Sequence, residues 1–222
     1  MSAIPKFPPQ IHHDTPPRLS VPTAARFLRL PAVEQWNMLR EQKYPKRAPQ
    51  VFKRQFYGVA RQGIRRMLDD GMAGLIQARA AAESIPEAPR REHTLRVLES
   101  FASSGHMARQ LRIAINRQYQ FDVNGLELRL SPDLFAYEGD EQRFIYFNLK
   151  AEQYDPEAAK MTLEIAHWLL EQVGVKIAPR QIEFVDLFTG VLYKISRRRS
   201  RTIKLLSDNA KLIERMWPAI EP

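Results

Sequence analysis

Polar residues that could bind a cation or a water molecule flank a segment rich in strand-forming residues. Asp133 follows Pro132 at one end, and Asn148 and Lys150 stand two residues apart at the other. Carboxylate and amide oxygens are ligands that Mg²⁺ and Mn²⁺ accept, and a lysine beside such an ion can hold or deprotonate an attacking water. These residue types are candidates for metal-assisted hydrolysis if the fold brings them together.

The segment is expected to fold as a β-hairpin. Two runs rich in aromatic and β-branched residues flank the polar, glycine-containing stretch 138–142. Because side chains alternate along a strand, Asn148, Lys150 and Glu152 are expected to share one face. Pairing of the two strands would place Asp133 near Asn148 and Lys150.

The flanking sequence supplies further elements. Asp155 followed by Pro156 is typical of a helix start. The expected elements, in chain order, are a helix over 91–116, a strand over 123–130, the hairpin, a helix over 156–172 and a strand over 181–195. The fold class expected is α/β, with a mixed central β-sheet flanked by helices.

This order resembles that of the PD-(D/E)XK nuclease superfamily, whose core runs helix, three-stranded meander, helix, strand. The resemblance covers residues 90–195 and rests on two short motifs, Pro132-Asp133 and Asn148-Leu149-Lys150. It implies a restriction-endonuclease-like core that hydrolyses phosphodiester bonds of DNA with Mg²⁺ or Mn²⁺. It also implies that Asp133, with Asn148 or Glu152, holds the cation, and that Lys150 orients the water.

One position departs from the family pattern. Asn148 stands where the family carries Asp or Glu, and a neutral amide oxygen is expected to weaken cation binding. Three interpretations remain open: an active site with a weakened metal shell, one that uses Glu152 instead, or a fold that has lost catalysis and binds nucleic acid or a partner protein. A glutamate on the first core helix is a further family feature. Glu92 and Glu99 are the candidates, and Glu99 is preferred as a catalytic residue.

Each of these residues also has an ordinary structural interpretation. Asp133 after Pro132 is a common turn or strand-entry pair. Asn148, Lys150 and Glu152 could be strand-end polar residues, and the helical glutamates could be solvated charges.

Positive charge indicates a polyanionic partner. The 34 Lys and Arg residues exceed the 25 Asp and Glu residues, which gives a net charge of +9. Nucleic acid, with DNA as the leading candidate, is the expected partner because its phosphates attract clustered cations. The candidate phosphate-binding residues come from two basic runs: Lys53, Arg54, Arg197, Arg198, Arg199 and Arg201. A solubilising role for these runs is the alternative.

Aromatic residues lie within and beside the first basic run. Tyr44, Phe52, Phe56 and Tyr57 could stack on unpaired bases, although such residues more often pack a core.

Composition suggests three regions: a proline-rich arm over 1–22, a helical cap over 23–87, and an α/β core over 88–222 that ends in a helix over 200–216. The arm or the terminal helix could join a homodimer or a partner protein. The absence of Cys excludes disulfides and thiolate metal sites and fits a cytoplasmic location. No apolar run is long enough to span a membrane, so no membrane partner is expected.

Overall fold

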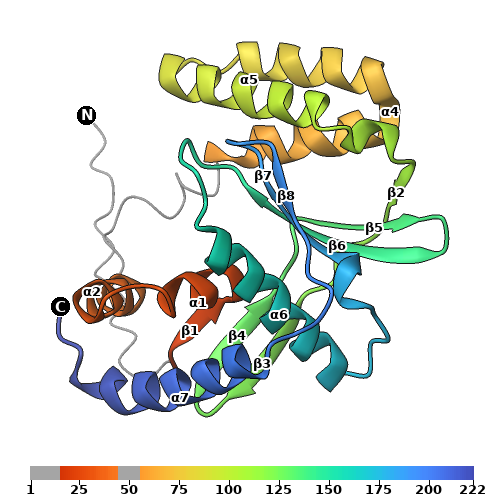
Figure 1. The fold of residues 1–222 in the computed structure, drawn as a ribbon. Helices are drawn as coiled ribbons and strands as arrows, with labels where there is room; N and C mark the ends of the chain where they lie inside the picture. Colours follow the sequence, from red (N-terminus) through yellow and green to blue (C-terminus); the bar gives the residue numbers. More distant parts are fainter. Residues whose placement is uncertain (1–15, 45–55) are drawn as a thin grey trace, which may run out of the picture.

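The computed structural model describes residues 16–44 and 56–222, whose strands form two separate mixed sheets (Figure 1). The larger sheet has five strands in the order β2 (Leu111–Ile113), β5 (Leu134–Glu138), β6 (Glu141–Asn148), β7 (Ile182–Asp186) and β8 (Val191–Tyr193). The smaller sheet has the order β1 (Arg18–Ser20), β4 (Leu126–Leu130) and β3 (Tyr119–Val123). The fold class is therefore α/β, with two mixed sheets flanked by helices rather than one central sheet.

Helices cover both faces of the five-stranded sheet (Figure 1). On one face, α4 (Gly58–Glu83) and α5 (Ala88–Ser103) pack against Ile145 and Val185. On the other face, α6 (Pro156–Gln172) packs against the Phe144 and Phe184 side. Strands β6 and β7 are parallel and α6 connects them, whereas the other neighbours in this sheet are antiparallel.

The remaining helices lie near the smaller sheet. They are α1 (Val21–Phe27), α2 (Ala32–Lys43) and α7 (Ser200–Met216), and three short 3₁₀ helices complete the described helices: η1 (His106–Ala108), η2 (Pro179–Gln181) and η3 (Trp217–Ala219). Helix α1 packs on α6, whereas α4 packs on α5. The helices of residues 23–87, expected as one cap, thus lie in two places (Figure 1).

A lysine from the first basic run is part of the core. Lys43 is buried, and its Nζ donates to the carbonyl oxygens of Trp217 at 2.6 Å and Ile220 at 3.0 Å. The same two carbonyl oxygens also accept hydrogen bonds from Ile220 N and Tyr44 Oη, so the ammonium is one of several donors that hold this segment. Lys43 therefore fixes the C-terminal segment to α2.

Several elements follow the sequence prediction. The hairpin of β5 and β6 is confirmed, with Phe135 opposite Phe144. Helix α6 begins after Asp155, whose carboxylate accepts a hydrogen bond from Glu157 N at 2.9 Å. Helix α7 covers residues 200–216 as expected.

The predicted helix over 91–116 and strand over 123–130 are wrong in extent. Helix α5 ends at Ser103, and η1 and β2 follow it. Asn124 and Gly125 adopt positive φ angles of 50° and 81°, which suit a tight turn between antiparallel strands. The predicted strand is consequently the β3–β4 hairpin.

Strand β4 also does not pair with β5. It pairs with β1 and β3, and β2 takes the place beside β5. The meander expected over 123–150 is therefore not formed as predicted. The predicted strand over 181–195 is in fact the antiparallel pair β7 and β8, joined by a turn.

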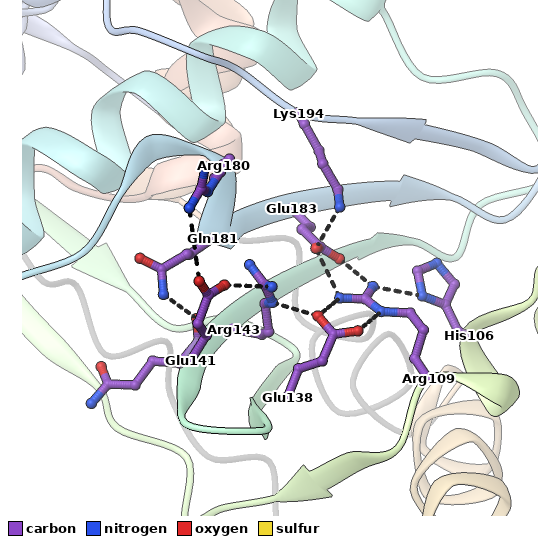
Figure 2. A network of polar contacts seen from close by, with 10 residues as sticks. His106, Arg109, Glu138, Glu141, Arg143, Arg180, Gln181, Glu183 and Lys194 are labelled. Atoms are coloured by element: carbon purple, nitrogen blue, oxygen red, sulfur yellow. Dashed lines mark hydrogen bonds and ion pairs between the residues drawn. The ribbon is translucent and has the colours of Figure 1, made fainter.

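An arginine between η1 and the five-stranded sheet holds two carboxylates (Figure 2). Arg109 donates to Glu183 at 2.6 and 2.9 Å and to Glu138 at 2.8 and 3.0 Å, and its Nη1 also lies 3.1 Å from His106 Nδ1. Glu183 is 0% exposed and forms a second ion pair with Lys194 at 3.0 Å. This Arg109 network ties the segment after α5 to β5 and β7.

The Arg109 network should make stability depend on pH in acid. Hydrogen bonds from Arg109 lower the pKa of Glu138 from 4.5 to about 2, so ionised Glu138 favours the folded state. A lowered pKa contributes stability above the unfolded value, and that contribution is lost as pH falls from about 4.5 to about 2. Urea unfolding of Glu138→Gln should show a shallower pH dependence over this range than the unmodified protein. Equal slopes would contradict this assignment.

Candidate functional site

Asp133, the predicted metal ligand, faces an arginine. Its side chain is 15% exposed, and its Oδ1 lies 2.9 Å from Arg61 Nε. Its Oδ2 accepts a hydrogen bond from Phe147 N at 2.9 Å, and Arg65 donates to its carbonyl oxygen at 3.0 Å. Burial raises the pKa of Asp133, and the charge of Arg61 opposes that rise. Both carboxylate oxygens thus already have donors.

Asn148 binds a buried aspartate from the next strand. It is 4% exposed, and its Nδ2 donates to Asp186 Oδ1 at 2.8 Å and to the Glu152 carbonyl at 2.8 Å. Its Oδ1 accepts from Lys150 N at 3.1 Å. Asp186 accepts three further hydrogen bonds, from Tyr154 N, Phe188 N and Thr189 Oγ1. In this cluster of contacts, the Asp186 junction, asparagine supplies a donor at position 148 that an ionised carboxylate lacks.

The other predicted residues point elsewhere. Lys150 Nζ lies 3.1 Å from Glu152 Oε1, and both side chains are substantially exposed. Glu99 is 60% exposed and lies 3.7 Å from Arg79. In the described residues, no hydrogen bond or ion pair joins Asp133 to Asn148 or Lys150.

The predicted metal ligands do not fit a divalent cation. Within residues 16–44 and 56–222, no three His, Asp or Glu side chains converge as metal ligands would. Asp133 has a guanidinium on one oxygen, and the Asn148 oxygen accepts a backbone N–H. The oxygen atoms expected to bind Mg²⁺ or Mn²⁺ are therefore already engaged in contacts within the protein.

A groove lies beside the end of β6, where the predicted motif ends. It has a volume of about 570 Å³ and is lined by Phe56, Tyr57, Pro89, Glu92, His93, Arg96 and Ala151. We call it the α5 groove because four of these residues belong to α5. Their spacing of three, four and seven residues places them on one face of the helix. Ala151 follows Lys150, so the groove adjoins the predicted site.

A histidine fixes one wall of the α5 groove. His93 Nε2 lies 2.6 Å from the Leu149 carbonyl oxygen, and Arg96 Nη2 lies 2.8 Å from His93 Nδ1. Because a carbonyl only accepts, Nε2 carries the proton and Nδ1 accepts from Arg96. Burial lowers the pKa of His93, which favours this neutral form. Both ring nitrogens are occupied, so His93 positions Arg96 and α5 against the end of β6.

Aromatic rings gather in the α5 groove. The rings of Phe56 and Tyr57 are 5.1 Å apart, and each lies within 5.8 Å of the His93 ring. The guanidinium of Arg96 lies 5.5 Å from the Phe188 ring, and that of Arg90 lies 5.9 Å from the Phe56 ring. Among the described residues, Arg96 forms no ion pair with a carboxylate. The groove thus combines the exposed guanidinium of Arg96 with aromatic surface.

Two of the four candidate arginines of the second basic run form ion pairs within the protein. Arg198 pairs with Glu171, and Arg199 pairs with Glu157 at 2.9 Å and Glu164 at 2.6 Å. Arg197 and Arg201 are exposed and have no ion pair in the part of the chain that the structure describes. Lys53 and Arg54, the candidates from the first run, lie outside the described residues.

The sequence analysis missed three residues with clear roles. Arg96 and His93 share a helix face with Glu92. The helical spacing of these charged and aromatic residues was the sequence signal that could have identified them. Asp186 is an acidic residue at the end of an apolar run, which is itself a sign of a buried polar junction.

Comparison of the chain with protein-family models, with characterised proteins and with solved structures finds no match. Within residues 16–44 and 56–222, none of the helices combines the length and apolar character needed to cross a bilayer.

Proposed function

We propose that this protein binds nucleic acid through the α5 groove and does not depend on a metal ion for that binding. One observation carries the proposal. The groove at the end of β6 presents Arg96 without a carboxylate partner among the described residues, together with the rings of Phe56 and Tyr57. Cations that follow a phosphate backbone, combined with rings that stack on bases, are the usual means of binding single strands.

The order of elements supports a nuclease-like frame for this groove. The strands of the five-stranded sheet that follow α5 along the chain are β2, β5 and β6, with the β3–β4 hairpin of the smaller sheet inserted between β2 and β5, and α6 and β7 come after them. This is the helix, three strands, helix and strand of the resemblance, with β2 in place of the strand expected over 123–130. The Arg61 contact of Asp133 and the Asp186 junction favour binding without cleavage on this frame.

The binding should weaken with salt. Each phosphate that a cation neutralises releases counterions, so the logarithm of the affinity falls linearly with the logarithm of salt concentration. Arg96→Ala is expected to weaken binding and to reduce that slope by about 1. Arg180→Ala is the matched control, because Arg180 is 71% exposed and lies in η2, outside the groove. Its affinity and slope should equal those of the unmodified protein.

The measurement is fluorescence anisotropy with labelled single- and double-stranded DNA and RNA, from about 50 to about 200 mM KCl. The affinity should be the same with EDTA, Mg²⁺ or Mn²⁺, and the strands should stay intact. No binding at about 50 mM salt, or equal effects of Arg96→Ala and Arg180→Ala, would refute the proposal. Metal-dependent cleavage that is lost in Asp133→Ala and Lys150→Ala would establish a nuclease instead.

A further inference from the structure

We propose that the α5 groove recognises an unpaired guanine, whose base edge donates to the carboxylate of Glu92. This inference rests on the proposed nucleic-acid binding and names its substrate class, a single strand that contains guanine. A second cavity also combines an aromatic ring, cations and a carboxylate, but its Asp122 accepts a hydrogen bond from Gly125 N and its Arg198 pairs with Glu171.

Glu92 is an unpaired carboxylate in an otherwise aromatic and basic groove. It is exposed, and no described residue forms a hydrogen bond or an ion pair with it. It lies one helical turn before Arg96 on the same face of α5. The glutamates near it differ in this respect, since Glu152 pairs with Lys150 and Glu99 lies beside Arg79. A carboxylate left without a donor beside stacking surface is suited to accept from a ligand.

The two charges of this helix face match the two ends of a nucleotide. Arg96 can bind a phosphate, which keeps the backbone at one side of the groove. Glu92, four residues earlier, would then meet the base edge rather than the phosphate, which it repels. The rings of Phe56 and Tyr57 supply the stacking surface.

Guanine is the base that a carboxylate fits. Its N1–H and N2–H point in the same direction and can donate to the two oxygens of one carboxylate. Adenine and cytosine each present an amino group beside a ring nitrogen that accepts, and uracil and thymine present one N–H between two carbonyls. These lone pairs would face the negative charge of Glu92, so the carboxylate discriminates against all four.

The size of the groove and the edge that it reads both indicate a single strand. A volume of about 570 Å³ is in the range that holds small ligands. In a duplex, N1–H and N2–H of guanine are bonded to cytosine, so Glu92 cannot reach them. A strand with unpaired bases presents that edge and can also stack on aromatic residues.

The test uses the full chain and labelled oligothymidine strands that carry one central guanine, inosine or adenine. Guanine is expected to bind roughly tenfold more tightly than adenine, as a good pair of hydrogen bonds to a base allows. Inosine keeps N1–H and lacks the amino group, so its affinity should lie between the two. RNA strands of the same sequences would show whether the sugar matters.

Glu92→Gln should bring the affinity for the guanine strand down to that for the adenine strand. Glu99→Gln is the matched control, because it removes the same charge from the same helix outside the groove, and it should keep the guanine preference. Equal binding of all three strands by the unmodified protein, or a guanine preference that persists in Glu92→Gln, would overturn this inference and leave the proposed function standing. If no strand binds, both proposals fail.

Discussion

Replacing Arg109 with methionine is expected to lower the free energy of unfolding by about 3–5 kcal/mol, the usual loss when one partner of a buried ion pair is removed. Glu183 is 0% exposed, and Arg109 donates to both of its oxygens. Methionine fills similar volume but leaves that carboxylate with Lys194 alone. Glu138 loses two hydrogen bonds in the same step, although it is closer to water.

The measurement is urea or thermal unfolding at neutral pH, followed by circular dichroism. The double variant Arg109→Met, Glu183→Leu should be more stable than Arg109→Met, because it removes the buried carboxylate that the single variant leaves with only Lys194 as a cationic partner. Arg180→Met removes an exposed ion pair and should change stability by less than about 1 kcal/mol. A loss below about 1 kcal/mol in Arg109→Met would show that the network contributes little.

Placing a carboxylate at position 148, as in the nuclease motif, should also destabilise the protein. In Asn148→Asp, a second carboxylate would lie where the Asn148 amide now donates to Asp186 at 2.8 Å. Position 148 is 4% exposed and position 186 is 0% exposed. Two negative charges at such a buried site repel each other strongly. We expect a loss of about 3–5 kcal/mol at neutral pH, as for other uncompensated buried charges.

The loss in Asn148→Asp should shrink as pH falls. The repulsion raises the pKa of the new carboxyl in the folded state above its unfolded value, so the penalty is complete above the folded pKa, shrinks as pH falls between the two pKa values, and disappears below the unfolded pKa. Asn148→Ala removes the hydrogen bond to Asp186 without adding charge, and should lose only about 1–3 kcal/mol with little pH dependence. Unfolding at several pH values distinguishes the two variants.

Divalent cations give the sharpest test of the Asp186 junction. If the junction is structural, Mg²⁺ or Mn²⁺ should not restore the stability of Asn148→Asp or give it cleavage activity. Recovery of stability with Mn²⁺, together with cleavage of DNA, would mean that one substitution rebuilds a metal site. That result would favour the nuclease hypothesis over binding without cleavage.

The Asp186 junction gives Asn148 a structural role. Its side-chain amide donates to Asp186 from the parallel strand β7, which an ionised carboxylate at that position could not do. The same strand end carries Leu149, whose carbonyl accepts from His93, so the motif segment also anchors the α5 groove. The proposed binding surface and the altered motif are thus parts of one structural arrangement.

The local sequence was sufficient for elements whose signals are short-range. The β5–β6 hairpin follows from two strand-forming runs around a glycine-containing turn. The start of α6 follows from its capping residues, and the extent of α7 follows from its apolar periodicity. The net positive charge and the absence of Cys were likewise read directly from the composition. In each case the deciding residues are neighbours in the chain.

Pairing between distant residues was decided only by the tertiary structure. The Asn124-Gly125 turn, which joins β3 to β4, was available in the sequence. The pairing of β4 with β1 was not, because it joins residues more than a hundred positions apart. Asp133 meets Arg61, Asn148 meets Asp186, and Arg109 meets Glu183 across 72, 38 and 74 positions. Spacing along the chain predicts which side chains share a face, whereas the partner of a buried charge is set by what the fold places opposite it.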